Sequence, residues 1–191
     1  MPLVTMATLV AMARAGRPVS FPTDTVPALA ALPEAASQIY TLKGRSETKP
    51  LILMAATAEA LWPYVEGTIH PDWQTAAGRY WPGPLTLVLP ASAQVPASVN
   101  PQQDGTIGLR IPRHPLALAI LQQTGPLATT SANLSGQPPL TNPKDLTQTF
   151  PGVFVLDRPA EGTGTPSTVV AWTAHQGWHL LRAGGIPFPL D

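Results

Sequence analysis

Prolines and glycines divide this chain into short pieces. The 191 residues include 24 prolines and 15 glycines, about a fifth of the sequence, and this share lies below the range typical of disordered chains. They fall between apolar runs, so they mark the ends of many short helices and strands. Because hydrophobic residues make up 44% of the sequence, we expect these short elements to pack around a core.

The apolar runs predict helices that alternate with strands. The expected helices are 5–15, 34–42, 57–65 (interrupted at Pro63), 72–81, 116–123 and 143–149. The expected strands are 18–21, 51–55, 85–89, 106–111, 153–157, 167–172 and 178–182, with one more beginning at Leu127. The last two should pair antiparallel around a tip at 175–177. Alternation of this kind, followed by a strand-rich end, predicts one α/β domain over residues 1–191 with a mixed sheet.

Composition excludes several classes of protein. The absence of cysteine excludes disulfides, thiolate metal sites and a cysteine nucleophile. With 11 basic and 11 acidic residues the net charge is zero, so bulk charge does not indicate a strongly basic nucleic-acid binder. No apolar run approaches the ~18 residues of a membrane span, and residues 1–16 resemble a helix more than a signal peptide. We therefore expect a soluble cytoplasmic protein.

The stretch from Pro126 to Gly136 concentrates small polar side chains directly after an apolar strand start. It reads P-L-A-T-T-S-A-N-L-S-G, and its hydroxyls and amide supply both donors and acceptors without a strong acid or base. This composition suits a backbone that approaches a polar, anionic ligand. An ordinary strand–turn–helix junction with a Ser or Asn N-cap explains it equally well.

Polar or charged residues also stand at the ends of predicted strands and turns in five places. These are Thr23-Asp24-Thr25, the group Lys43, Arg45 and Lys49, Arg110, the pair Ser131 and Asn133, and Ser167 with Arg182. Ligands of open α/β sheets bind at strand ends, so one shared cleft is the economical hypothesis. Cations that converge there would bind an anion such as a nucleoside triphosphate. Each cation taken alone is explained as well by solvation at the surface.

Other common sites are missing from the sequence. It contains no P-loop, no dinucleotide-binding glycine motif and no nucleophile-elbow motif. His175 and His179 flank the predicted hairpin tip without the second pair of ligands that a zinc site would need, and we expect no metal bound by protein side chains alone.

The chain resembles the YrdC/TsaC family, the threonylcarbamoyl-AMP synthases, over most of its length. Eight motifs in sequence order carry the resemblance: Phe21-Pro22-Thr23-Asp24-Thr25-Val26, Lys43-Gly44-Arg45, Lys49-Pro50-Leu51, Pro82-Gly83-Pro84-Leu85-Thr86, Gly108-Leu109-Arg110-Ile111-Pro112, Thr130-Ser131-Ala132-Asn133-Leu134-Ser135-Gly136, Ser167-Thr168-Val169-Val170 and Leu181-Arg182. One such motif would be weak evidence, whereas eight in order are strong. The resemblance implies a twisted, open mixed α/β sheet with flanking helices and a concave basic face.

The resemblance also implies a reaction and a set of site residues. Such nucleotidyltransferases combine L-threonine, bicarbonate and ATP into threonylcarbamoyl-AMP and release pyrophosphate. By similarity, ATP would be bound by Arg45, Lys49, Asn133 and Arg182, with Lys43 near its phosphates, and catalysis would rest on Lys43, Arg45 and Lys49. Threonine or its carbamate would be held by Thr23 or Thr25, Arg110, Ser131 and Ser167.

Such a reaction needs no enzyme nucleophile, because the carbamate oxygen of threonine attacks the α-phosphorus. Catalysis is then positioning and neutralisation of phosphate charge. Mg²⁺ is expected with ATP, bound mainly by phosphate and water. Downstream proteins would transfer the threonylcarbamoyl group to tRNA, and tRNA itself is a possible contact. A chain that ends soon after the last motif is expected to be the short, single-domain form of the family.

Two departures from the family pattern leave alternatives open. The family usually continues the first motif with an aromatic residue, Gly, Leu and Gly, whereas this chain has Pro27, Ala28, Leu29 and Ala30. Met54 stands where some members have His. Both changes bear on substrate choice more than on fold. One alternative is a paralogue that lost adenylation and binds a nucleotide or RNA, and another is a carbamoyl-transfer relative.

Overall fold

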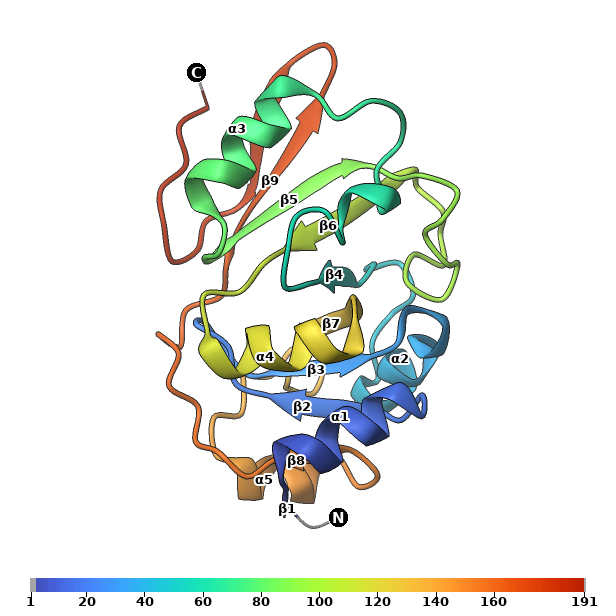
Figure 1. The fold of residues 1–191 in the computed structure, drawn as a ribbon, viewed down its shortest axis with the longest axis vertical. Coiled ribbons are helices and arrows are strands. Elements are labelled where there is room, and N and C mark those ends of the chain that lie inside the picture. Colours follow the sequence, from blue (N-terminus) through green and yellow to red (C-terminus); the bar gives the residue numbers. More distant parts are fainter. Residues whose placement is uncertain (1–2, 191) are drawn as a thin grey trace.

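One mixed sheet runs through the computed structural model, which describes residues 3–190 (Figure 1). Its ten strands lie in the order β1-β8-β2-β3-β7-β4-β6-β5-β9-β10. Neighbours β4 and β6 run parallel, whereas β3 and β7 run antiparallel. The strands are β1 (Leu3–Val4), β2 (Val19–Phe21), β3 (Ala28–Ala31), β4 (Ile52–Met54), β5 (Leu85–Pro90), β6 (Thr106–Arg110), β7 (Leu127–Ser131), β8 (Phe154–Leu156), β9 (Thr168–Thr173) and β10 (Gly177–Arg182). This open mixed sheet confirms the predicted fold class.

Helices cover both faces of the sheet and create two apolar cores. The α-helices of the described range are α1 (Met6–Arg14), α2 (Ser37–Lys43), α3 (Pro71–Tyr80), α4 (Pro115–Thr124) and α5 (Pro143–Thr149). Side chains of α1 and α4 pack with Ala28 and Ala30 of β3, whereas side chains of α2 and α3 pack with Leu29 and Ala31. Since successive strand residues point to opposite faces, the two cores lie on opposite sides of β3.

Helices α1 and α4 cover only part of their side of the sheet. A pocket lies on the part that they leave uncovered. Along β6, Thr106, Gly108 and Arg110 line this pocket, while Ile107 and Leu109 between them are buried in the core on the other side. The period of two in this short strand therefore separates the ligand-accessible side from the core. Among residues 3–190, no helix is long and apolar enough to cross a membrane.

Local sequence explains most of the elements. Thr5 caps α1 by accepting a hydrogen bond from the Thr8 amide at 3.3 Å, and Asn142 caps α5 through the Lys144 amide at 2.9 Å, as expected of N-cap residues. Strands β9 and β10 pair antiparallel, as predicted. The helix expected at 34–42 begins as a 3-10 turn at Pro33–Ala35, and α2 starts only at Ser37.

One expected helix was wrong, and two strands, β1 and β3, were not expected. The helix predicted over 57–65 is reduced to a 3-10 turn at Trp62–Tyr64, because Pro63 lacks an amide hydrogen and interrupts a longer helix. Strand β3 was not predicted at all, because alanine has a low strand propensity. It forms because it lies between β2 and β7 and pairs with both.

We expect the central position of β3 to make its leucine a strong contributor to stability. Leu29→Ala should lower the free energy of unfolding by about 2–5 kcal/mol, since Leu29 is fully buried and its removal leaves a cavity. Leu180→Ala is the matched control: Leu180 is 46% exposed on the edge strand β10, and its loss should cost less than about 0.5 kcal/mol. Urea unfolding of both variants measures the difference, and equal losses would contradict this account of β3.

Candidate functional site

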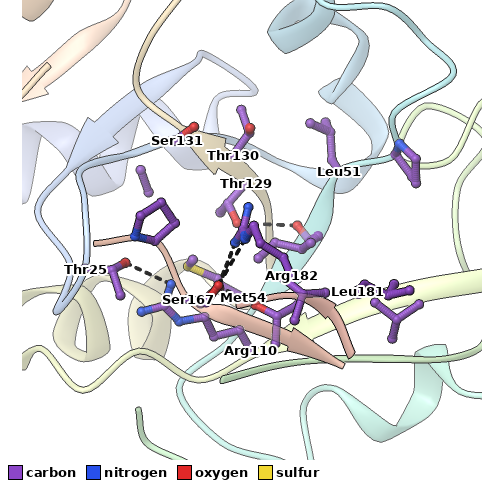
Figure 2. A pocket seen from close by; sticks show the side chains of 18 of the residues that line it. Thr25, Leu51, Met54, Arg110, Thr129, Thr130, Ser131, Ser167, Leu181 and Arg182 are labelled. Carbon is purple, nitrogen blue, oxygen red and sulfur yellow. Dashed lines mark hydrogen bonds between the residues drawn. The ribbon is translucent and has the colours of Figure 1, made fainter. Parts of the chain in front are cut away.

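A pocket of about 390 Å³ opens on the uncovered face of the sheet (Figure 2). Strands β3, β7, β4, β6, β5, β9 and β10 all contribute to its wall, together with the turn before β3 and the segment before β4. Figure 2 shows Thr25 and Arg110 at one end, with Leu51 and Leu181 at the other. The pocket therefore gathers residues from nearly the whole length of the sequence.

Two arginines enter the pocket without a carboxylate partner. Arg45 donates from Nε to the Lys49 carbonyl oxygen at 2.9 Å and from Nη2 to the Pro50 oxygen at 3.0 Å. Arg182 donates from Nε and Nη2 to the Ser167 carbonyl oxygen at 3.1 and 2.9 Å. Within residues 3–190 neither takes part in an ion pair. Backbone oxygens thus fix both guanidinium groups and leave their charge and Nη1 donors available to an anion.

A bulge in β10 explains why two successive residues line the pocket. The register shifts between Leu180, which pairs with Val170, and Arg182, which pairs with Val169. An extra residue in one strand changes the direction of the side chains that follow. Leu181 and Arg182 both reach the pocket as a result.

Arg110 differs from the other two arginines because it is buried and paired. It is 3% exposed, and its Nη2 donates to Asp24 Oδ1 at 2.6 Å while Nη1 donates to the Thr25 hydroxyl at 3.0 Å. Burial lowers the pKa of Arg110, and the charge of Asp24 opposes that shift. Thr23 supports the same network through its hydroxyl, 3.1 Å from that of Thr25. The result is a neutralised, rigid polar end of the pocket.

Lys43 does not project into the pocket but fixes the turn after β7. Its Nζ donates to the carbonyl oxygens of Ser131 and Asn133, both at 2.5 Å, and to Asn133 Oδ1 at 3.1 Å. These three bonds use all three hydrogens of the ammonium group. Burial lowers the pKa of Lys43 to about 8, and the nearby Arg45 charge acts in the same direction. Lys43 thereby sets the position of Ser131, which lines the pocket.

The pocket brings together six of the ten predicted site residues. Those that line it are Thr25, Arg45, Arg110, Ser131, Ser167 and Arg182. Thr23, Lys43 and Asn133 lie behind the wall and are joined to it by hydrogen bonds. Lys49 is exposed outside the pocket, and its backbone oxygen orients Arg45.

Sequence reasoning gave no site role to five polar residues of the wall, which are Thr86, Asp104, Thr106, Thr129 and Thr130. Thr86 is buried on β5, and its hydroxyl lies 2.9 Å from that of Ser167; strict alternation with Leu85 and Leu87 could have indicated its direction. Asp104 precedes β6 in a loop whose sequence gave no such indication.

In the described residues, no cluster of three or more His, Asp, Glu or Cys side chains could bind a metal ion.

The two departures from the family pattern also fall on this pocket. Pro27, Ala28 and Met54 all line it. None of residues 27–30 has a positive φ, so alanine replaces glycine there without backbone strain. The substitutions therefore change the side chains that line the pocket and do not strain the backbone.

The sequence model of the Sua5/YciO/YrdC family, described as telomere recombination, matches residues 11–184. The chain belongs to this family. All the pocket residues discussed above fall within the matched range. A TM-score of 0.86 relates the fold to the crystal structure of Pyrococcus abyssi Sua5 complexed with L-threonine, at 34% identity over 95% of this chain and 54% of that one.

Two relatives at 37–38% identity carry the same functional name. A threonylcarbamoyl-AMP synthase of Pyrococcus abyssi is 38% identical over 182 residues, covering 91% of this chain and 52% of that protein. A threonylcarbamoyl-AMP synthase of Escherichia coli O1:K1 is 37% identical over 160 residues, covering 80% of this chain and 83% of that protein. The chain thus spans about half the length of the first relative and most of the second.

The lowered pKa of Lys43 predicts a specific pH dependence of stability. Between the folded value of about 8 and the unfolded value of about 10.4, the unfolded chain binds more protons, so this group raises the free energy of unfolding as pH rises. The rise should reach about 1–2 kcal/mol by about pH 9.5, and Lys43→Met should lack it. Urea unfolding at about pH 8 and at about pH 9.5 measures this rise in the free energy of unfolding. Lys49→Met controls for loss of a positive charge, and an unchanged profile in Lys43→Met would refute the assignment.

The pair formed by Asp24 and Arg110 predicts a large, asymmetric loss of stability. Asp24→Asn keeps the shape but leaves the buried Arg110 charge unpaired, and should cost about 3–5 kcal/mol. The double variant Asp24→Asn with Arg110→Met removes both charges and should recover most of that loss. Thermal or urea unfolding of the three proteins checks this, and a cost below about 1 kcal/mol for Asp24→Asn would argue against a dry ion pair.

Proposed function

We propose that the protein is a threonylcarbamoyl-AMP synthase that binds ATP and L-threonine together in this pocket. The observation that carries the proposal is the pair of arginines, Arg45 and Arg182, which line the pocket and form no ion pair with any carboxylate in residues 3–190. An uncompensated double positive charge next to hydroxyls suits a triphosphate. The names of the family relatives, and the L-threonine complexed with the Pyrococcus abyssi protein, support the same assignment.

The pocket divides between the two substrates. Arg45 and Arg182 would bind the phosphates, with Lys49 approaching from outside. The neutralised end formed by Thr25, Arg110 and Ser167 would hold the carboxylate and hydroxyl of threonine, and hydrogen bonding to that hydroxyl would select threonine over apolar amino acids. Thr23, Lys43 and Asn133 act from behind the wall, where they fix the residues that touch the substrates.

Chemistry then requires little from the protein beyond orientation. The threonine amine and bicarbonate give a carbamate and water, a carbamate oxygen bonds to the α-phosphorus, and pyrophosphate leaves. Arg45 and Arg182 stabilise the charge that develops on the phosphates. Mg²⁺ would neutralise phosphate charge when bound, and the scarcity of carboxylates in the described pocket fits an ion held by phosphate and water.

The product would be an activated carbamoyl donor, which a later reaction must consume. By similarity to the family, that reaction would transfer the threonylcarbamoyl group to tRNA. We propose that partner proteins carry out this transfer in the cytoplasm. We further propose that tRNA itself contacts the protein at the exposed Lys49.

Calorimetry and product analysis test the proposal. Wild-type protein with ATP, threonine and bicarbonate should form threonylcarbamoyl-AMP and pyrophosphate. Arg45→Gln and Arg182→Gln should each weaken ATP binding by about 10–100-fold, since each removes a charge-assisted hydrogen bond. Arg79→Gln, on an exposed position of α3 outside the pocket, should leave binding unchanged. Binding of both substrates without product would instead indicate a binding module.

A further inference from the structure

Asp104 stands apart from every other residue of the pocket wall. It alone among the residues that line the pocket carries a carboxylate. It lies in the loop before β6, is exposed at the rim, and takes part in no ion pair within residues 3–190. An acidic group without a cation partner needs an explanation in a pocket that two free arginines make positive.

The carboxylate is held in one orientation by its own loop. Asn100 Nδ2 donates to Asp104 Oδ1 at 2.7 Å, and the amide and hydroxyl of Thr106 donate to the same oxygen at 2.9 and 2.8 Å. Asn100 is 3% exposed and gives its other hydrogen to the Thr106 carbonyl oxygen at 3.0 Å. All three donors act on Oδ1, and Oδ2 makes no hydrogen bond to any described residue. A fixed, free acceptor costs little ordering entropy when a ligand binds.

Strand geometry places this acceptor far from the neutral polar end of the pocket. Four residues of extended β6 separate Thr106 from Arg110, which corresponds to about 13 Å. Asp104 precedes Thr106 and lies beyond that end of the strand. The loop is joined to the segment before β4 through the Leu51 amide, which donates to the Val99 carbonyl oxygen at 2.9 Å. Apolar Leu51, Val88 and Leu181 line the pocket with it, and Figure 2 shows Leu51 and Leu181 well separated from Thr25.

The charge of Asp104 restricts what it can contact. A carboxylate accepts hydrogen bonds and repels phosphate, so its partner within a bound nucleotide must be an uncharged donor. In a nucleoside triphosphate such donors occur only on the nucleoside, as ribose hydroxyls and the exocyclic amine of adenine. The apolar side chains that line the same pocket suit the faces of a base. We infer that Asp104 is a specificity-determining residue whose Oδ2 accepts a hydrogen bond from the nucleoside of the bound nucleotide; this inference rests on the proposed ATP-dependent function.

A cycle of nucleotide analogues and variants tests the inference. Calorimetry would compare ATP, 2′-deoxy-ATP, 3′-deoxy-ATP and inosine triphosphate, in which an oxo group replaces the amine. Wild-type protein should bind at least one analogue about tenfold or more weakly than ATP, as expected for a hydrogen bond to a charged group. Asp104→Asn keeps an oxygen for Asn100 and Thr106 but loses the charge, and its discrimination against that analogue should fall to about twofold. The analogue whose penalty disappears identifies the donor.

Two further variants sharpen the comparison. Asp104→Ala, checked for folding by its unfolding transition, should lose the same discrimination. Asp145→Asn removes a carboxylate from an exposed position of α5 outside the pocket and should keep the wild-type pattern. Full discrimination in Asp104→Asn, or equal binding of all four nucleotides by the wild-type protein, would overturn the inference. A changed Mg²⁺ dependence with unchanged discrimination would also overturn it, since the carboxylate would then serve the cation.

The two proposals fail separately. Product formation together with unaltered discrimination in Asp104→Asn would overturn the role of Asp104 and leave the synthase assignment standing. Loss of discrimination in Asp104→Asn, with no product from the wild-type protein, would support the nucleoside contact and refute the synthase assignment.

Discussion

The contact between Asp24 and Arg110 lies where three parts of the chain meet. Local structure alone would not bring these parts together. Arg110 lies on β6, Asp24 lies in the turn between β2 and β3, and the segment 162–164 is bonded to that turn through the Asp24 and Thr25 carbonyl oxygens. Gly162 approaches so closely that a Cβ there would lie 2.3 Å from the Thr25 oxygen. The polar end of the pocket exists because this buried pair offsets the cost of removing a guanidinium from water.

Charge in the pocket is graded from one end to the other. Arg110 is neutralised by a carboxylate, whereas Arg45 is oriented by backbone oxygens and Arg182 by the carbonyl and hydroxyl oxygens of Ser167. Asp104 adds a carboxylate that forms no ion pair with any residue in the range 3–190. A ligand with an uncharged part, a strongly anionic part and a small zwitterionic neighbour matches this sequence of environments better than a uniformly charged polymer does.

The sequence predicted those features of the fold and the pocket that depend on the type and spacing of neighbouring residues. The expected strand 106–111 carries Arg110, which lines the pocket, and the eight motifs contain five more residues that line it: Thr25, Arg45, Ser131, Ser167 and Arg182. It could not predict features that depend on contacts with residues distant in the chain. Ala28–Ala31 is a strand only because two neighbours pair with it. The ammonium group of Lys43 turns inward because backbone oxygens from β7 and its turn meet it, and Asp104 reaches the pocket through a loop whose path Asn100 determines; no local pattern encodes either contact.

The edge position of β10 has a kinetic consequence. β10 pairs with β9 alone, yet it carries Leu181 and Arg182 into the wall. Edge strands separate from a sheet at a lower free energy than central strands do. Each transient separation would withdraw the cation proposed to bind phosphate together with a hydrophobic side chain, so the lifetime of a nucleotide bound as proposed would be limited by the fraying of this strand as much as by its direct contacts.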